Sequence, residues 1–318
     1  MSDLLIEARD LVRIYRVPSA ALFSGPRYIR AVDGVSLQVR KGKTLGLVGE
    51  SGCGKSTVGK LLAGREKPDG GTVSFHGSDG KAGPQMIFQD AYSSLNPRKR
   101  IRDILAEPLR YRGMLAPGGE NARIRELLDM VGLPDNTAGK YPHELSGGQR
   151  QRVCIAGALS VDPEFIVCDE PVSALDVSIQ AQILNLLKDL QRELGIGMLF
   201  IGHGLATVRY VSHDIAVMYL SRLVETAPAE ELFRNPVHPY TKALLAAVPT
   251  LDLQADPFGK PLLTGEAGDI ADPPAGCRFH PRCTRCSDRC VREIPELMPA
   301  GEGHMAACHC CAGKEAGS

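Results

Sequence analysis

The sequence has 318 residues, enough for one large hydrophobic core or for two domains. Its 37 lysine and arginine residues balance its 37 aspartate and glutamate residues, and the missing basic excess argues against a nucleic-acid partner. No apolar run approaches the length of a membrane-spanning helix and the N-terminus has no features of a signal peptide, so we expect an intracellular protein.

Two segments near the N-terminus, residues 4–15 and 31–39, have the composition of strands in an N-terminal sheet. The segment between them, residues 18–28, contains proline and glycine and is expected to form a loop. Tyr15 is either a core aromatic residue or a platform for an adenine ring, and its position alone favours the core.

A glycine-rich motif follows a short apolar segment at residues 45–48, and apolar residues at helical spacing follow the motif up to Gly64. This context predicts a phosphate-binding loop and a bound nucleoside triphosphate, rather than an ordinary glycine-rich turn. Lys55 can reach the β- and γ-phosphates, and the Ser56 hydroxyl can hold Mg²⁺. The predicted nucleotide-binding residues are Gly49, Glu50, Ser51, Gly52, Cys53, Gly54, Lys55, Ser56 and Thr57.

The next segments change from strand to helix. Residues 70–75 and 85–89 are predicted strands. Residues 91–160 are predicted to be a helical insert, with one helix over residues 101–109 and another that begins at an Asn121 cap.

A second polar glycine loop precedes another predicted helix. Ser146, Gly147 and Gly148 offer a hydroxyl, backbone N–H groups and a helix N-terminus, which together can clamp a phosphate. Two phosphate-binding loops in one domain make sense when one of them serves a nucleotide bound to another subunit.

The continuous apolar run at residues 165–168 predicts a parallel strand that is buried on both faces. Asp169 and Glu170 follow it directly, at the strand end where open α/β sheets carry their chemistry. Asp169 can hold Mg²⁺ through water, and Glu170 can polarise an attacking water. The alternative is an acidic pair that caps a helix.

A long amphipathic helix is predicted next, and Gly195 ends it. Residues 198–201 form a predicted strand that leads to His203, and a final hairpin completes the nucleotide-binding fold by about residue 225. The predicted buried face of the helix contains Ile179, Ile183, Leu186, Leu187, Leu190 and Leu194.

Taken together, these motifs resemble the ATP-binding subunit of an ABC transporter from about residue 4 to residue 225. The resemblance implies an α/β P-loop nucleotide-binding domain over residues 1–228, with a parallel core sheet, an N-terminal antiparallel sheet and a helical subdomain at about residues 91–160. It also implies that two subunits pair head to tail around ATP and Mg²⁺. The signature that would reach the partner's nucleotide is Leu145, Ser146, Gly147, Gly148 and Gln149.

Roles for individual residues follow from the resemblance alone. Tyr15 would stack on adenine, and Gln89 would sense Mg²⁺ and the attacking water and couple to the membrane subunits. Glu170 would be the general base, His203 would contact the γ-phosphate, and Asp176 would communicate across the dimer. The implied magnesium ligands are Ser56, Gln89 and Asp169.

Three glycines depart from the usual pattern of this family. Gly202 and Gly204 flank the histidine, where a serine, alanine or threonine and an aspartate are usual. Gly157 replaces a common arginine in the signature helix and costs about 1 kcal/mol of helix stability relative to alanine. Reduced activity is one expectation from these departures. His213 lies ten residues too late to be the γ-phosphate histidine.

The remaining segment, residues 229–318, is similar to the C-terminal extension of oligopeptide/dipeptide importer ATPases at residues 235–245 and 277–283. This resemblance implies a peripheral subunit at the cytoplasmic face of the cell membrane. Its implied partners are a second homologous ATPase subunit, two transmembrane permease subunits and an extracytoplasmic solute-binding protein. The solute would be a di- or oligopeptide, with nickel or glutathione as alternatives.

Seven of the ten cysteines crowd between Cys277 and Cys311, and without secretion a metal or cluster site explains them better than disulfides. Four thiolates can hold an iron–sulfur cluster or zinc. The resemblance favours a [4Fe-4S] cluster over zinc or empty thiols. The matching set is Cys277, Cys283, Cys290 and Cys308, and an alternative zinc set is Cys283, Cys286, Cys308 and His309, with Cys310 and Cys311 as extras.

Two rival functions remain. A soluble ABC ATPase that acts on ribosomes or DNA would carry two cassettes or a long coiled-coil insertion, and the sequence has neither. The other rival is a redox-responsive regulatory protein whose main function lies in the cysteine-rich tail.

Overall fold

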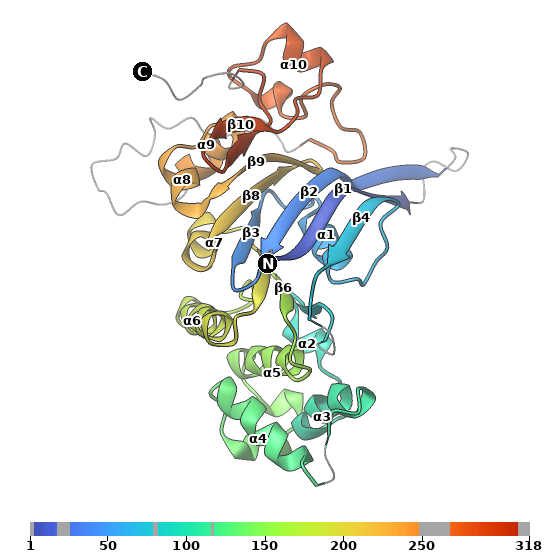
Figure 1. Ribbon diagram of the computed structural model, residues 1–318, viewed down its shortest axis with the longest axis vertical. Coiled ribbons are helices and arrows are strands. Elements are labelled where there is room, and N and C mark those ends of the chain that lie inside the picture. Colours follow the sequence, from blue (N-terminus) through green and yellow to red (C-terminus); the bar gives the residue numbers. More distant parts are fainter. Residues whose placement is uncertain (1–2, 18–25, 79–81, 116–117, 248–267, 311–318) are drawn as a thin grey trace.

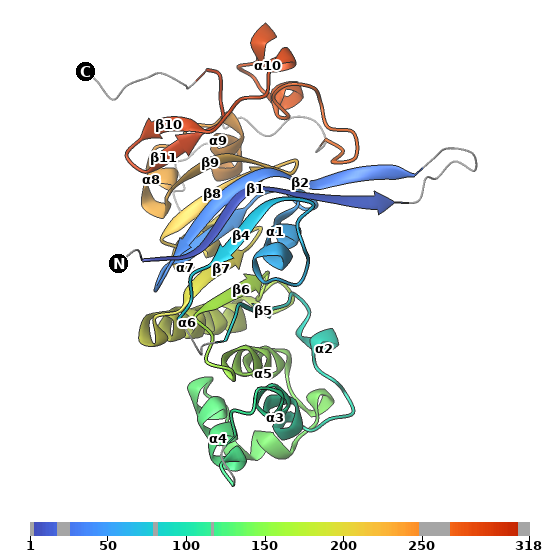
Figure 2. The ribbon, with the colours of Figure 1, turned by 45° about the vertical axis from the view of Figure 1, so that its right-hand side comes forward.

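The computed structural model has two sheets that pack against each other, with a group of helices beyond one edge of the larger sheet (Figures 1 and 2). The smaller sheet is antiparallel and consists of β1 (Leu4–Val17), β2 (Arg27–Arg40) and β4 (Gly70–Phe75) in the order β2-β1-β4. It confirms the predicted N-terminal sheet. Tyr28, however, lies within β2 and not in the predicted loop. The described residues are 3–17, 26–78, 82–115, 118–247 and 268–310.

The larger sheet has the strand order β10-β11-β9-β8-β3-β7-β6-β5. From β8 to β5 its neighbouring strands are parallel, and β9 pairs antiparallel with β8. Every residue of β3, β6 and β7 is buried, as continuous apolar runs in a parallel sheet predict. The bounds are β3 Thr44–Val48, β5 Gln85–Ile87, β6 Phe165–Asp169, β7 Gly197–Ile201, β8 Asp214–Tyr219 and β9 Arg222–Pro228.

Three helices cover the faces of the larger sheet: α1 (Lys55–Leu62), α6 (Val177–Leu194) and α7 (Leu205–Val211). Figure 2 shows α1 between the two sheets, where Val58, Leu61 and Leu62 are buried in a common core. Gly195 ends helix α6 as predicted, and its backbone is left-handed, with a φ of 63°. The prediction that Leu194 is buried is wrong, because residues 192–194 are all exposed in the last turn of the helix.

The helical subdomain contains α2 (Ala91–Ser94), α3 (Ile101–Tyr111), α4 (Glu120–Met130) and α5 (Gly147–Leu159), with the short 3₁₀ turns Asp135–Gly139 and Pro142–Glu144. The apolar side chains of this subdomain belong to the same hydrophobic core as those of α6 and of several strands of the larger sheet. The predicted Asn121 cap is wrong by two residues, since α4 begins at Glu120 with Gly119 as its N-cap. Glu120 in the first turn pairs with Arg110, and a negative charge there favours the helix N-terminus.

The C-terminal extension adds α8 (Ala229–Arg234), α9 (Pro239–Ala246), α10 (Asp288–Arg292), β10 (Met298–Gly301) and β11 (His304–Ala306). Strand β11 pairs antiparallel with β9, so the sheet that carries the phosphate loop also contains two strands of the extension. The expectation that the fold is complete by about residue 225 missed these strands, which are too short for their pairing to be evident from sequence.

A buried contact between a histidine and a glutamate holds the extension at this point. Nε2 of His304 lies 2.7 Å from Oε1 of Glu225, and neither side chain is more than 2% exposed. The same carboxylate accepts hydrogen bonds from the backbone N–H groups of Val237 and His238. Glu225 therefore joins β9, β11 and the segment before α9. Among the helices that the structure describes, none combines the length and the apolar character needed to cross a membrane.

Candidate functional site

The phosphate loop connects β3 to α1, and its shape requires glycine. Gly54 precedes the helix with a φ of 107°, and a Cβ atom there would lie 2.0 Å from the carbonyl oxygen of Ala31. Lys55 is 5% exposed, and its Nζ donates to the carbonyl oxygens of Gly49 and Glu50 at 2.8 and 2.9 Å. The lysine side chain thus folds back over the loop.

Ser56 and Asp169, which the sequence suggested from separate motifs, are in direct contact. The Ser56 hydroxyl donates to Oδ1 of Asp169 at 2.9 Å. Burial raises the pKa of Asp169, and the neighbouring Glu170 carboxylate adds to that rise, while the hydrogen bond from Ser56 opposes it. A hydroxyl and a carboxylate are oxygen ligands of the kind that Mg²⁺ prefers, so these residues fit the ion.

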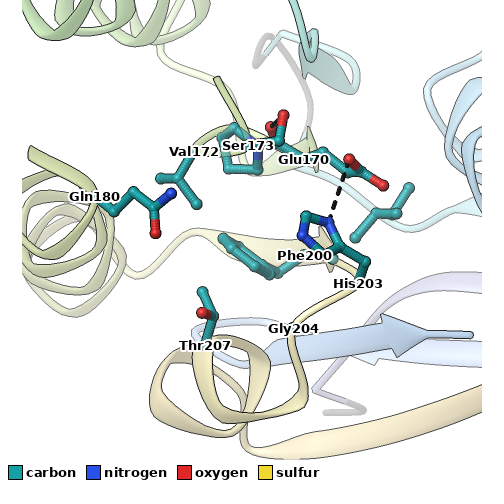
Figure 3. A pocket seen from close by; sticks show the side chains of 11 residues that line it. Glu170, Val172, Ser173, Gln180, Phe200, His203, Gly204 and Thr207 are labelled. Atoms are coloured by element: carbon teal, nitrogen blue, oxygen red, sulfur yellow. Dashed lines mark hydrogen bonds and ion pairs between the residues drawn. The ribbon is translucent and has the colours of Figure 1, made fainter. Parts of the chain in front are cut away.

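Glu170 follows β6 in a strained backbone conformation, with a φ of 45°. Its N–H donates to the carbonyl oxygen of Ile201 at 3.0 Å, which ties it to the end of β7. Nε2 of Gln89 donates to Oε2 of Glu170 at 3.0 Å. Nδ1 of His203 lies 3.5 Å from the same oxygen, and Figure 3 shows this contact between Glu170 and His203. Three predicted catalytic side chains therefore converge at Oε2 of Glu170.

A pocket opens beside Glu170 and His203, between the ends of β6 and β7 and the helices α6 and α7 (Figure 3). Its wall includes residues that the sequence did not single out as site residues. Motif spacing gave no signal for them, because they come from different elements. They are Val172, Gln180, Phe200 and Thr207.

Tyr15 does not belong to the core, and the preference drawn from its position alone is wrong. It is half-buried, and its hydroxyl donates to Oε2 of Glu66 at 2.6 Å. The guanidinium of Arg13 lies over its ring, 4.9 Å from the centroid. An aromatic face can bind a cation, as this one does with Arg13, or a planar base.

The second glycine loop lies at the start of α5 in the helical subdomain. The Ser146 hydroxyl accepts from the N–H of Gln149, whose side chain accepts from the N–H of Ser146, in a capping box. Leu145 and Gly148 are buried. Asp176 caps α6 by accepting from the N–H of Ile179 at 3.0 Å. Within the described ranges, no hydrogen bond or ion pair joins these residues to residues 49–57 of the same chain.

Comparison with known proteins agrees with this geometry. Residues 32–173 match the family described as ABC transporter, and residues 224–290 match the oligopeptide/dipeptide transporter C-terminal region. The oligopeptide transport ATP-binding protein AppF of Bacillus subtilis is 44% identical over 96% of this chain and 97% of its own length. The di/tripeptide transport ATP-binding protein DppF of Pseudomonas aeruginosa is 44% identical over 96% of this chain and 98% of its own length.

The chain belongs to the ATP-binding proteins of ABC transporters. Among solved structures, the dimeric post-hydrolysis state of the ATP-binding cassette MJ0796 bound to ADP and Pi has a TM-score of 0.60 at 25% identity, and covers 71% of this chain and 99% of its own. The predicted α/β fold, with a parallel core sheet, an N-terminal antiparallel sheet and a helical subdomain, is confirmed. ABC ATPases use ATP and Mg²⁺, and Ser56 and Asp169 supply suitable ligands here.

One departure from the usual ABC pattern, Gly202, has a structural reason. A Cβ atom at Gly202 would lie 2.8 Å from Cγ2 of Val208, so this backbone is packed too tightly for a side chain. Gly204 is the N-cap of α7 and caps it without a side chain. His213 accepts from the N–H of Thr44 at 3.1 Å, and burial lowers the pKa of His213. It therefore joins β3 to the start of β8.

The described cysteines of the extension lie close together but do not form a metal site in this arrangement. Burial raises the pKa of Cys277 to about 11, with further rises from Cys290 and Cys283. Burial also acts on Cys290, but hydrogen bonds from Ser287 and Cys310 outweigh it and lower that pKa. Cys308 is buried, and the His309 ring contacts the carbonyl oxygen of Glu293. No group of three or more metal-ligating side chains among the described residues is arranged around a common centre. Cys311 lies outside the described residues.

Two residues of the extension reach the phosphate loop, and the sequence did not single them out. The N–H of Glu50 donates to the hydroxyl of Tyr240, and its carboxylate pairs with Arg282. Both residues fall inside the segments that resemble the peptide-importer extension. The phosphate loop lies about 190 or more residues before them in the sequence, so only the folded chain shows the contact.

Proposed function

We propose that this protein hydrolyses ATP to drive the import of di- or oligopeptides through a membrane permease. The observation that carries the proposal is the convergence of Gln89 and His203 on Glu170 beside the Ser56–Asp169 pair, at the ends of adjacent parallel strands. Support for a peptide as the solute comes from relatives named as peptide transport proteins that are similar over nearly the whole chain.

In this proposal, the loop at residues 49–57 binds the phosphates, and Lys55 leaves the loop carbonyls to neutralise their charge. Oε1 of Glu170 accepts a proton from water as the water oxygen attacks the γ-phosphorus. The bond from that phosphorus to the β–γ bridging oxygen breaks, and ADP leaves. Gln89 and His203 orient the carboxylate through Oε2. Mg²⁺, when bound by Ser56, Asp169 and Gln89, supplies charge neutralisation on the β- and γ-phosphates.

We infer that the signature at residues 145–149 serves the nucleotide of a second, homologous ATPase subunit. Ser146 offers its hydroxyl at an exposed helix N-terminus, which suits a phosphate that comes from outside the chain. Asp176 would then lie near the same interface, and Tyr15 would stack on adenine. The complete assembly would add two transmembrane permease subunits and an extracytoplasmic solute-binding protein, with this chain bound peripherally at the cytoplasmic face of the membrane.

We also propose a division at residue 228, with the nucleotide-binding domain before it and the cysteine-bearing extension after it. A [4Fe-4S] cluster on Cys277, Cys283, Cys290 and Cys308 remains a prediction, as does zinc. Because the described thiols do not converge as they stand, no step of the mechanism involves either group. Anaerobic purification followed by iron, sulfide and zinc analysis decides between them, and a colourless, iron-free protein with stoichiometric zinc would exclude the cluster.

The decisive experiment is copurification of this chain with its permease, followed by an ATPase assay in membranes with the solute-binding protein. We expect a di- or oligopeptide to stimulate hydrolysis severalfold. Stimulation by nickel or glutathione instead would change the solute, whereas hydrolysis that never responds to any permease would favour a soluble, non-transport ATPase. A chain with Lys55→Ala, which lacks the phosphate-binding cation, serves as the inactive control.

A further inference from the structure

Glu50, the second residue of the phosphate loop, is held by two side chains of the C-terminal extension. Its N–H donates to the Tyr240 hydroxyl at 2.9 Å. Nη1 of Arg282 donates to both of its carboxylate oxygens, at 2.9 and 3.0 Å. Its carbonyl oxygen accepts from Nζ of Lys55 at 2.9 Å. One loop residue therefore joins the extension to the lysine that we assign to the phosphates.

These contacts are in a well-packed place. The Arg282 side chain is 8% exposed and Tyr240 is fully buried. The Tyr240 ring packs against Tyr219 and Phe279, with centroids 4.6 and 5.5 Å away. A partly buried ion pair adds little net stability, because its desolvation offsets its attraction, but it fixes the groups around it. The arrangement is thus better suited to orienting the loop than to stabilising the fold.

A second contact between the extension and the loop runs through the turn between β8 and β9. The N–H of Ser221 donates to the carbonyl oxygen of Cys53 at 2.9 Å. Arg278 of the extension donates to the carbonyl oxygen of Leu220, the residue before Ser221, and to the carboxylate of Asp33. The extension therefore holds both ends of the bend in the loop, directly at residue 50 and through this turn at residue 53.

We propose that Tyr240 and Arg282 are positioning residues for the phosphate loop, and that through them the C-terminal extension sets the affinity for ATP. The proposal rests on the proposed function for the identity of the nucleotide. A phosphate loop binds by aiming its N–H groups at one point, so its backbone must be held. Arg282 also neutralises Glu50, whose carboxylate would otherwise repel the triphosphate.

The test is a double-mutant cycle on the purified full-length chain, with a fluorescent ATP analogue as the probe. We expect Arg282→Gln to raise the Kd about tenfold, the size typical of a lost charged hydrogen bond. Glu50→Gln combined with Arg282→Gln should recover most of that loss, because the unpaired carboxylate is gone. Arg282→Lys should recover part of it. Tyr240→Phe, which keeps the ring packing, should raise the Kd about threefold and speed hydrogen exchange at the Glu50 amide.

Two measurements separate positioning from a merely structural role. Under positioning, KM for ATP rises in Arg282→Gln while kcat stays within about twofold, since Glu170 is untouched. Arg292→Gln removes an exposed arginine of the same segment and serves as the matched control. If Arg282→Gln fails to fold, Tyr240→Phe and the double variant carry the test.

The outcomes distinguish this inference from the proposed function. A wild-type chain that does not bind the ATP analogue would overturn the proposed function itself. A wild-type chain that binds it, together with folded Arg282→Gln and Tyr240→Phe variants of unchanged Kd, would overturn only the positioning role. The same holds if the Glu50→Gln substitution gives the Arg282→Gln chain no recovery.

Discussion

The side-chain amide of Gln89 donates to Oε2 of Glu170 at 3.0 Å, just beyond the ends of the neighbouring strands β5 and β6. Strand β5 is the edge of the main sheet, and α2 of the helical subdomain begins shortly after it. A residue at the junction of the two parts of the molecule thus holds the carboxylate that we assign as the base. This hydrogen bond is one link between the helical subdomain and the proposed chemistry.

Glu170→Gln removes the proposed proton acceptor but keeps the size of the side chain. We expect turnover to fall by roughly 10² to 10⁴, because a positioned general base contributes about that much. ATP should stay bound, since Lys55 and the loop are unchanged. The rates are compared in a phosphate-release assay, and binding in a filter assay. Hydrolysis near the wild-type rate would show that another group accepts the proton.

Gly157→Ala should stabilise the signature helix. The closest atom to a Cβ at this position is Cδ2 of Leu105 at 4.0 Å, so a methyl group fits without strain. Replacing a helical glycine by alanine contributes about 0.5–1 kcal/mol to the free energy of unfolding. Urea denaturation measures the gain.

Gly148→Ala is the matched control for this change. Gly148 lies in the same helix, but the opposite effect on stability is expected there. Its Cβ would lie 2.6 Å from Cγ2 of Ile179, so we expect a loss of about 1–3 kcal/mol as α5 and α6 move apart. If both variants changed stability in the same direction, space around the glycine would not be the deciding factor.

The sequence predicted the parts of this molecule that depend on local pattern. The strand–loop–helix around Lys55 and the buried strand before Asp169 have strong periodicity and turn signals, and their elements were predicted within a few residues. The Ser56–Asp169 contact was foreseeable because both residues follow parallel strands of one sheet. The burial of Leu194 was misjudged, because an apolar residue in the last turn of a helix need not have a neighbour to cover it.

Contacts across the chain could not be predicted in the same way. The pairing of β11 with β9 involves only two residue pairs, too few to give a pattern. The ion pair between Arg282 and Glu50 joins residues 232 positions apart. Arginine and glutamate are both common residues, so nothing in the sequence marks these two as partners. Only the folded chain shows that the extension reaches the loop.

His238 makes the stability of the extension depend on pH. Burial lowers its pKa to about 3, well below the 6.5 of an unfolded histidine. The folded chain therefore binds fewer protons than the unfolded chain between these values, so stability is full above pH 6.5 and falls as the pH drops toward 3. The expected slope from this residue is about 1.4 kcal/mol per pH unit.

Urea unfolding at several pH values between 7.5 and 4.5 measures that slope, and His238→Asn isolates its source. Asparagine also caps helices, so it can replace the ring nitrogen that accepts from the N–H of Tyr240 in α9. We expect a shallower pH dependence for this variant, by about one proton. His76→Asn changes an exposed histidine and should keep the wild-type slope. An equal slope in all three chains would assign the acid sensitivity to other groups.

Asp169→Asn should change stability and activity in opposite directions. Burial, together with Glu170, raises the pKa of Asp169 above 3.8, so at neutral pH its charge is less favourable in the folded chain than in the unfolded chain. Asparagine removes that charge and can still accept from the Ser56 hydroxyl. The variant should therefore resist urea better than the wild type at pH 7, and the difference should shrink as the pH falls toward 3.8. Magnesium-dependent hydrolysis should fall by roughly 10² or more, because the variant lacks the carboxylate that we assign to the metal. Asp189→Asn, an exposed carboxylate on α6, should leave both properties unchanged. Lower stability of Asp169→Asn at pH 7 would mean that the charge is stabilised in place, by Lys55 or Lys60, and that the carboxylate is structural as well as functional.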